Sequence, residues 1–318
     1  MIAAAQWNDR VRRRLKLRDV DILLAVVQTG SMGKAANALN MSQPAVSKAI
    51  AELEHTLGVR LLDRSRQGVE PTPYGRALMK RGIAIFDELR QGVQDISFLT
   101  DPTVGEIRAG GSETMVSAVF SPVIRRLLGQ HPRMSFLIEI GDFRMLSREL
   151  DARRIDVVIS RLYGPPSEEH SVEILFEDPL VVVTGSNNPL VRRRKIELSD
   201  LLDEPWTLQP PDNTFGSVAM DPFRAAGLVA PRLTVATTSS ALRNELLATG
   251  RYLTVLPRFS VLLPRRHASL RVLPVELPNA RHKVAAVTLK NRSLTPATQL
   301  FIAGVRAITK PLAREKMA

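Results

Sequence analysis

The chain contains no cysteine, which excludes disulfide bonds, thiolate zinc sites and cysteine nucleophiles. Aromatic residues are also scarce, at 5% of 318 residues, and no apolar run approaches the roughly 18 residues of a membrane-spanning helix. The basic segment "VRRR" follows the few apolar residues of the N-terminus, which is the reverse of a secretory signal peptide. These absences predict a soluble protein of the reducing cytoplasm. The hydrophobic content of 44% is enough for about two domains.

Basic residues outnumber acidic ones mainly near the N-terminus. Residues 10–81 hold 14 basic and 6 acidic residues, whereas residues 82–318 hold 30 and 25. Most of the formal net charge of +12 therefore lies in a small part of the chain. A small basic domain joined to a nearly balanced large one predicts a polyanionic partner for the first domain only. The later charge run "VRRRKIE" at residues 191–197 is interpreted as a solvated face.

Helical patterns follow one another between residues 17 and 57, separated by short turns. Apolar residues recur at helical intervals from residue 17 to residue 27, Gly30 ends that pattern, and Ser31 is placed to cap the next helix. Asn40 occupies the following turn, because asparagine tolerates a positive φ angle. Ser42 is then expected to cap a third helix. The face of this helix that points away from the core carries Gln43, Pro44, Ser47, Lys48 and Ala51.

That compact polar face suits a recognition helix, because amides, hydroxyls and one cation can reach base edges in the major groove. The following segment, "VRLLDRSRQGVEPT", predicts two short strands around a tip, which would form a wing. Its arginines are placed to contact phosphates or a minor groove, although a solvated charged hairpin is the alternative. The sequence thus predicts a winged helix-turn-helix that binds DNA. The predicted DNA-binding residues are Ser31, Lys34, Ser42, Gln43, Pro44, Ser47, Lys48, Arg60, Arg64 and Arg66.

A long helix is predicted from Thr72 and Pro73 to Asp101 and Pro102. Its apolar and glycine residues are spaced alternately four and three apart, at Leu78, Gly82, Ile85, Leu89, Gly92, Ile96 and Leu99. This heptad spacing predicts a dimerisation seam, in which the two glycines would allow close approach of a partner helix. Packing of the helix on its own domain is the alternative.

From residue 104 onward, strand and helix patterns alternate, which predicts an α/β domain with a largely parallel sheet. Strands "GEIRAG", "MSFLIEI" and "IDVVIS" alternate with helices over 115–128 and 143–154. After a crossing strand, "PLVVVTG", a second set contains strands "WTLQ", "RLTVAT" and "YLTVLP" and helices over 215–226 and 239–249. "HKVAAVTLK" would return to the first set before a last helix over 296–308. Two lobes joined by crossover strands would leave a cleft between them.

The segment "GSMGKAANALNMSQPAVSKAIAELEHTLGVRLLDR", followed by "PTPYG", resembles the signature of the LysR-type bacterial transcriptional regulators. The resemblance implies an N-terminal, mainly α winged helix-turn-helix, a long linker helix, and an α/β two-lobed regulatory domain of the periplasmic-binding-protein type. The corresponding boundaries are 15–72, 73–101 and 102–318. Lobe I would comprise about 102–178 and 281–318, and lobe II about 179–280.

The resemblance also implies the partners. They are double-stranded operator DNA with dyad symmetry, a small-molecule effector, further copies of the chain in a dimer or homotetramer, and RNA polymerase; no cofactor is implied. Gln43, Pro44, Ser47 and Lys48 match the recognition-helix positions of the family, and Arg64 matches its wing arginine. Leu62 stands where an aromatic residue is frequent in the family.

The effector site of the family lies at the loop after the first strand of the regulatory domain, here residues 110–114. The residues support this loop, because Ser112 and Thr114 precede a helix whose free N–H groups favour an anion or a polar acceptor. Arg161 is expected to clamp a carboxylate, and Asn213 and Thr214 to close over the ligand. Simple helix capping by Ser112 and Thr114 is the alternative.

The class of effector stays open at this point. Glu113 is awkward beside an anion, and if its carboxylate points inward it favours a neutral polyol, a sugar or an amine-bearing effector. Both an organic acid and a sugar are therefore retained.

Other functional classes have weaker support. The sequence has no nucleophile elbow, phosphate-binding glycine loop or dinucleotide fingerprint, and its five histidines are scattered without metal-ligand spacing. It therefore predicts a regulator that is not an enzyme, binds no metal, and senses a small polar metabolite. An enzyme fused to a DNA-binding domain and a nonspecific architectural DNA-binding protein are the alternatives.

Overall fold

The computed structural model describes residues 13–65, 68–262 and 269–314. The chain divides into two compact units, one ending at Val93 and the other beginning at Gln94. Within the described ranges, no helix is both long enough and apolar enough to cross a membrane.

The N-terminal unit consists of three short helices, a hairpin and most of a long helix. These elements are α2 (Leu17–Thr29), α3 (Met32–Ala38), α4 (Gln43–Leu57), β1 (Leu62–Ser65), β2 (Gly68–Pro71) and α5 (Pro73–Thr100). The turns between the helices use the residues that the sequence indicated, because Gly30, Asn40 and Gly58 have positive φ angles of 67°, 52° and 70°. Strands β1 and β2 pair antiparallel to form the wing.

The two predicted helix caps of this unit behave differently. The Ser42 hydroxyl accepts a hydrogen bond from the backbone N–H of Ala45 at 3.4 Å and so caps α4. Ser31 occupies the corresponding position before α3, but its side chain makes no capping bond. The predicted capping role of Ser31 is therefore wrong, and the Ser31 hydroxyl is left for other contacts.

Small residues let the helices of this unit approach one another closely. Ala35 and Ala36 of α3 are fully buried among apolar side chains of α2 and α4. A Cβ atom on Gly82 of α5 would lie only 2.5 Å from the Cγ1 atom of Val20 in α2. Gly82 thus serves packing within its own unit, and its predicted role at a partner helix is wrong. A Cβ atom on Gly92 would meet no described atom within 4 Å.

Helix α5 leaves an apolar stripe uncovered beyond Gly82. Exposed fractions rise from 43% at Ile85 to 81% at Leu99. We call this stripe the exposed seam, and it comprises Ile85, Leu89, Val93, Ile96 and Leu99. A contiguous apolar stripe of this kind on a helix marks a surface for a partner.

The second unit is built on one sheet of nine strands. Its path is β4-β3-β5-β11-β6-β9-β7-β8, and β10 pairs with β6 off this path. The strands are β3 (Val104–Gly111), β4 (Arg133–Ile140), β5 (Val157–Arg161), β6 (His170–Gly185), β7 (Trp206–Leu208), β8 (Leu233–Ala236), β9 (Leu253–Pro257), β10 (Leu270–Val272) and β11 (Arg281–Leu289).

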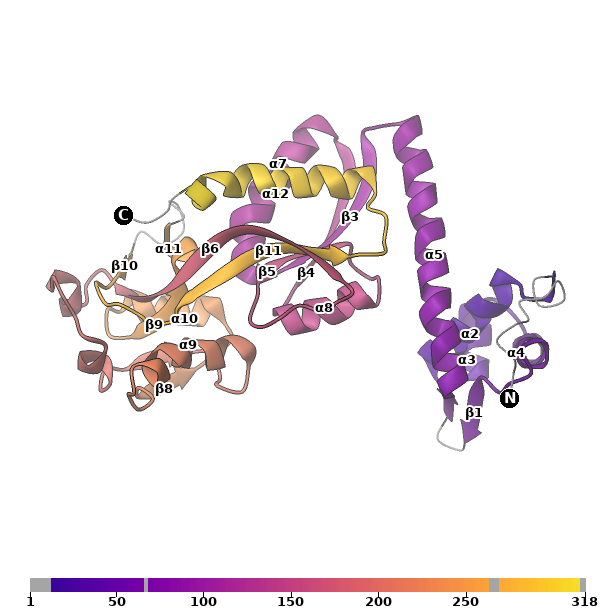
Figure 1. The fold of residues 1–318 in the computed structure, drawn as a ribbon, viewed down its shortest axis with the longest axis horizontal. Coiled ribbons are helices and arrows are strands. Elements are labelled where there is room, and N and C mark those ends of the chain that lie inside the picture. The colour runs from indigo at the N-terminus through magenta and orange to yellow at the C-terminus, as the bar shows by residue number, and fades with distance from the viewer. Residues whose placement is uncertain (1–12, 66–67, 263–268, 315–318) are drawn as a thin grey trace. The chain divides into compact units, whose positions relative to one another are not determined.

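Strand direction divides this sheet into three parts. Strand β3 runs parallel to β4 and β5, and β7 runs parallel to β8 and β9, whereas the long strands β6 and β11 pair antiparallel with each other between the two sets. The sheet is therefore mixed, and the prediction of a largely parallel sheet holds only for its two ends. Figure 1 shows β6 and β11 running between the two sets of strands.

Helices cover both ends of the sheet. They are α6 (Glu113–Met115), a π-helical turn (Val116–Phe120), α7 (Ser121–Gln130), α8 (Phe143–Asp151), α9 (Thr214–Ala225), α10 (Ser240–Ala248), α11 (Arg258–Leu262) and α12 (Pro296–Arg314), with short 3-10 turns at Pro189–Arg192 and Leu198–Leu201. Helices α7 and α12 lie on one face of the first set of strands and α8 on the other (Figure 1). The segment predicted as one helix over 115–128 contains the end of α6, the π-helical turn and most of α7. Helix α8 ends early because Arg153 adopts a φ angle of 58°.

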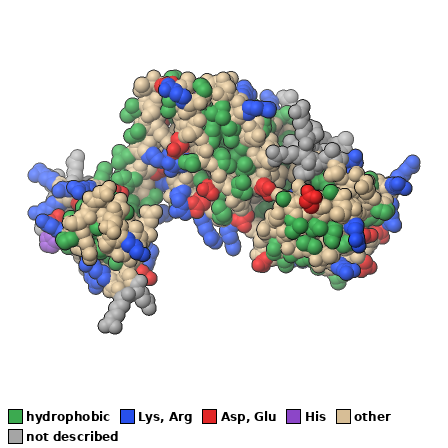
Figure 2. Space-filling view, turned by 180° about the vertical axis from the view of Figure 1, so that it is seen from behind, with side chains coloured by type: hydrophobic (Ala, Val, Ile, Leu, Met, Phe, Trp, Pro, Cys, Tyr) green, Lys and Arg blue, Asp and Glu red, His purple; other side chains and the backbone are tan. Residues whose placement is uncertain are grey.

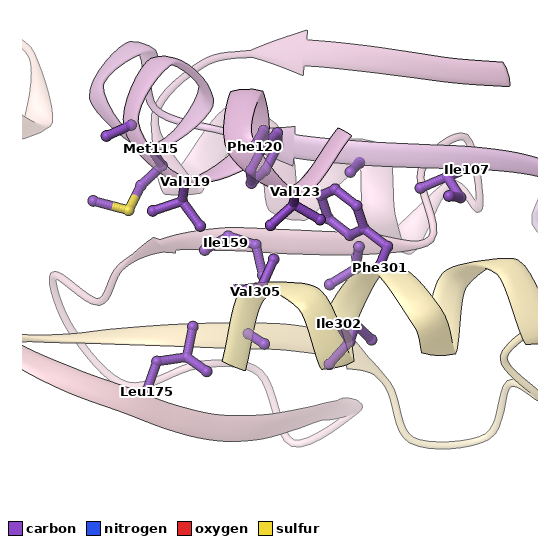
Figure 3. Close-up of a cluster of buried hydrophobic side chains, with 14 of the residues drawn as sticks. Ile107, Met115, Val119, Phe120, Val123, Ile159, Leu175, Phe301, Ile302 and Val305 are labelled. Atoms are coloured by element: carbon purple, nitrogen blue, oxygen red, sulfur yellow. The ribbon is translucent and has the colours of Figure 1, made fainter. Parts of the chain in front are cut away.

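The two largest hydrophobic cores of this unit define its two lobes. Side chains from the π-helical turn and α7 face α12 in the first core (Figure 3), where the rings of Phe120 and Phe301 meet edge to face at 5.0 Å. In the second core, Trp206 and Phe223 meet in the same way at 5.5 Å. We call the parts around these cores the first and second lobes.

Candidate functional site

Helix α4 presents a polar face opposite its buried residues. Val46, Ile50 and Leu53 are buried in the core of the N-terminal unit. On the other side, Gln43, Pro44 and Lys48 are exposed, whereas Ser47 is half-buried. The structure therefore brings four of the predicted DNA-binding residues together on one helix face.

Polar atoms of α3 and α4 converge beside Gly33. The Gln43 Oε1 atom and the Ser31 Oγ atom lie 3.8 and 3.9 Å from the place where a Cβ atom of Gly33 would be. The neighbouring Lys34 is exposed. A Cβ atom at these distances would be in ordinary van der Waals contact with both oxygens, so the space beside Gly33 is bordered by polar atoms of Ser31 and Gln43.

The wing adds arginines that form weak ion pairs or none. Arg64 is exposed on β1 and takes part in none of the ion pairs found among the described residues. Arg60 faces Asp63 at 3.7 Å, and both side chains are largely exposed. Exposed pairs of this kind contribute only about 0–1 kcal/mol, so a phosphate can replace the carboxylate at little cost. Arg66 lies outside the described residues.

Lys48 is held in the same weak way, 3.8 Å from Glu52 one turn along α4. On the face of the N-terminal unit that Figure 2 shows, blue Lys and Arg side chains gather with little red from Asp and Glu between them. This surface has the charge expected of one that contacts a polyanion.

A second candidate site lies where the two lobes of the second unit meet. Glu113, at the start of α6, accepts a hydrogen bond through Oε1 from the Ser240 hydroxyl of α10 at 2.5 Å. Asp142 accepts a longer one from the Thr214 hydroxyl of α9 at 3.4 Å. The ring of Tyr163 lies 6.4 Å from that of Phe215. We call this region the lobe junction: Ser112, Glu113, Asp142 and Tyr163 of the first lobe and Thr214, Phe215, Ser240 and Arg243 of the second.

The predicted effector residues of the loop after β3 lie at this junction. Ser112 precedes α6 but makes no capping bond, and its hydroxyl is buried without a hydrogen-bond partner among the described residues. Capping therefore does not account for Ser112. Thr114 is half-buried, and its backbone carbonyl accepts a hydrogen bond from Ser117 at 3.2 Å. A buried hydroxyl without a partner is unusual in a native protein, and a water molecule or a bound group can supply the missing hydrogen bond.

Arg161 differs from the prediction of a free carboxylate clamp. Its side chain is 4% exposed and forms an ion pair with Asp178, which is 2% exposed. Asp178 is held in turn by the backbone N–H of Phe259 at 2.9 Å. Asp178 of β6 thus supplies the carboxylate that a buried cation requires, while the Nε atom of Arg161 is buried without a hydrogen-bond partner among the described residues, so the carboxylate clamp stays a prediction.

Asn213 likewise has a local role. Its Oδ1 atom accepts from the backbone N–H of Gly216 at 2.6 Å, which caps α9, and its amide donates to Gln209 at 3.0 Å. The side chain is therefore occupied, whereas the neighbouring Thr214 reaches the first lobe through Asp142.

Tyr163 and His282 form a neutral aromatic contact beside Arg161. Their rings meet edge to face at 5.1 Å. Burial raises the pKa of Tyr163 to about 12, so its hydroxyl stays protonated. Burial also lowers the pKa of His282, and the positive charge of Arg161 acts in the same direction. Both the Tyr163 phenol and the His282 imidazole are therefore uncharged at neutral pH.

The sequence analysis missed five residues of the lobe junction, namely Asp142, Tyr163, Phe215, Ser240 and Arg243. Asp142 follows β4, Tyr163 follows β5, and Ser240 and Arg243 follow β8. Ligands of open α/β sheets bind beyond the carboxyl ends of strands, so a search of every strand end would have found these residues. Within the described residues, no group of three His, Asp or Glu side chains is arranged to hold a metal ion.

Comparisons with known proteins assign both parts of the chain to one family. Residues 17–76 match the model of the "Bacterial regulatory helix-turn-helix protein, lysR family", and residues 100–309 match that of the "LysR substrate binding domain". The regulator GbpR of Azospirillum brasilense is 27% identical over 307 residues, which covers 95% of this chain and 89% of GbpR.

Solved structures show the same fold. A full-length OxyR variant of Pseudomonas aeruginosa is 21% identical, with a TM-score of 0.65 over 95% of this chain and 99% of that one. Full-length CbnR in complex with its target DNA is 22% identical, with a TM-score of 0.53 over 93% of this chain and 100% of that one. The chain therefore belongs to the LysR family of transcriptional regulators, in which a DNA-binding helix-turn-helix domain is joined to a two-lobed effector-binding domain.

Proposed function

We propose that this regulator reads its operator through α4 and holds the DNA backbone through the wing. The observation that carries the proposal is the exposed polar face of α4, with Gln43 and Ser47 beside Lys48. Side-chain amides and hydroxyls read base edges, whereas lysines and arginines contact phosphates. In this proposal Ser31, Lys34 and Pro44 border the reading face, Ser42 positions α4 as its cap, and Arg60, Arg64 and Arg66 serve the wing. The complex of the similarly folded CbnR with its target DNA supports this use of the fold.

We propose a different role for each of the three segments predicted from the sequence. Residues 15–72 bind DNA, residues 73–101 pair two copies of the chain, and residues 102–318 sense the effector. Pairing through the exposed seam places two recognition helices on one operator, which accounts for dyad symmetry. We further propose a homotetramer built from such pairs that acts on RNA polymerase in the cytoplasm.

The regulatory unit is proposed to bind a small polar metabolite, an organic acid or a sugar, at the lobe junction, and to be a sensor without catalytic turnover. Support comes from the buried hydroxyl of Ser112 and from the polar contacts that link the lobes there. A ligand held between two lobes stabilises one lobe arrangement over another, and that difference can be passed to the DNA-binding units.

The DNA-reading proposal predicts different effects for α4 and for the wing. Gln43→Ala and Ser47→Ala should each weaken binding to a selected operator duplex by about 5- to 150-fold, or about 1–3 kcal/mol, with little effect on random duplex. Arg64→Ala should weaken binding to both duplexes and lower the salt slope by roughly one, because it removes a phosphate contact.

Fluorescence anisotropy in a salt titration measures both quantities. His55→Ala provides the control, because His55 is exposed in the last turn of α4, about two turns further along the helix than Ser47 and Lys48. Parent-like discrimination in both α4 variants would assign base reading to another part of the chain.

A further inference from the structure

Glu113 and Ser240 join the lobes through a single side-chain hydrogen bond. The two residues are 127 positions apart in the sequence, and Glu113 is exposed at the solvent edge of the lobe junction. The Glu113 carboxylate is therefore an anion supplied by the first lobe and bound by a hydroxyl of the second. Water can reach this bond, so a dissolved anion can compete for the same hydroxyl.

Arg243 provides a cation on the same face of α10, one turn after Ser240. Its guanidinium donates through Nε and Nη2 to the Asn244 amide oxygen at 3.3 and 3.2 Å, and none of the ion pairs found among the described residues includes it. Burial lowers the pKa of Arg243, while the negative charge of Glu113 opposes that shift. Arg243 is thus a partly desolvated cation whose hydrogen-bonding partner is a neutral amide. Such a cation gains from a carboxylate partner.

Ser112 adds a third donor on the first lobe. Its buried hydroxyl has no hydrogen-bond partner among the described residues, and it directly precedes Glu113. Two hydroxyls and one guanidinium, all from residues of the lobe junction, are the donors that a carboxylate requires. A neutral sugar would leave the charge of Arg243 unpaired, so these donors favour an organic acid.

We infer that Glu113 is a built-in competitor for the effector: a small organic acid binds Ser240 and Arg243 with its carboxylate and displaces the carboxylate of Glu113 from Ser240. This inference rests on the proposed function, in which the ligand lies at the lobe junction. Displacement breaks the Glu113–Ser240 hydrogen bond between the lobes. Effector binding is thereby coupled to a change in lobe contact, since the bound and free states differ in which carboxylate Ser240 holds.

The inference predicts opposite effects of removing the two charges. Glu113→Gln should tighten binding of acetate about fivefold, because the charged competitor is gone. Arg243→Met should weaken acetate binding at least about tenfold. The full-length protein is titrated with acetate, with neutral acetamide and with inorganic phosphate up to about 100 mM, and the backbone NMR signals of Ser112 and Ser240 are followed.

Two variants control for long-range charge. Glu245→Gln removes a carboxylate from an exposed position of α10, and Arg251→Met removes a guanidinium from an exposed position beyond its end. Both should bind acetate like the parent. Phosphate in place of acetate, with the same dependence on Glu113 and Arg243, would show that the site takes anions other than carboxylates and would overturn the assignment to an organic acid.

Lobe contact is measured separately, and the absence of cysteine allows clean spin labelling at Arg148→Cys in the first lobe and Val229→Cys in the second. Acetate should shift the label distances toward those of Glu113→Ala, and should not shift that variant further. The inference is wrong if Glu113→Gln binds acetate no more tightly than the parent, if Arg243→Met binds it equally well, or if acetate perturbs neither serine. Binding of acetamide at the junction, unaffected by either substitution, would refute the inference and leave the proposed function standing.

Discussion

Placing a glutamate at Ile85 and another at Leu89 is expected to dissociate the pairs of linker helices and to abolish high-affinity operator binding. Both side chains are about half-exposed in the single chain, at 43% and 50%. Covering the rest of each contributes about 1 kcal/mol, so four such side chains in a symmetric pair contribute about 4 kcal/mol. Their loss, with four carboxylates brought together, should weaken self-association at least about a thousandfold.

Analytical ultracentrifugation over a concentration series measures the association directly. Ala77→Glu is the control, because it adds the same charge to an exposed position of α5 outside the exposed seam. Its self-association should match that of the parent. An unchanged oligomer in the Ile85→Glu, Leu89→Glu variant would show that the exposed seam is not the pairing surface.

Replacing Asp178 by asparagine is expected to lower the free energy of unfolding of the regulatory unit by about 3–5 kcal/mol, because it leaves a buried cation without a counter-charge. Arg161 and Asp178 are 4% and 2% exposed, so water cannot replace the lost carboxylate. The asparagine keeps an oxygen that can accept from the backbone N–H of Phe259. The loss therefore reports the charge and not the shape of the side chain.

The same strand provides a matched control. Glu173 of β6 pairs with Arg306 through two hydrogen bonds of 2.6 and 2.7 Å, but both side chains are about half-exposed. Glu173→Gln should cost only about 0–1 kcal/mol. Urea unfolding followed by circular dichroism compares the two variants, and equal losses would contradict the structural role assigned to Arg161 and Asp178.

The sequence predicted helices and strands well where local chemistry determines them. Gly30, Asn40 and Gly58 end or turn helices because their φ angles are positive, and that preference is a property of the residue itself. The polar face of α4 was predicted for a similar reason, since the spacing of buried residues alone decides which side chains point outward. The division of the chain between a basic and a balanced part followed from composition.

Contacts between residues far apart in the sequence were not predictable in this way. The partner of Arg161 lies on a strand that crosses between the lobes, so no local pattern showed that the guanidinium is already neutralised. Gly82 fits the heptad spacing, yet the nearby atom belongs to Val20 of α2. The mixed direction of the sheet also depends on how β6 and β11 pair, and strand patterns do not specify pairing.

The lobe junction contains residues that the sequence predicted and residues that it did not. Ser112 and Glu113 were identified from the loop that precedes α6, whereas Ser240 and Arg243 were missed, because nothing in the α10 segment distinguishes it from an ordinary amphipathic helix. Only the packing of the lobes brings Ser240 to Glu113.

The most direct test of the account is a selection of DNA duplexes from a random pool by the full-length protein. Binding through paired α4 helices predicts an enriched motif with two inverted half-sites about one helical turn, or a small multiple of it, apart. The Gln43→Ala, Ser47→Ala double variant should fail to enrich that motif while still retaining DNA at low salt. If the parent protein enriches no motif, or the double variant enriches the same one, α4 does not read the operator and the account is contradicted.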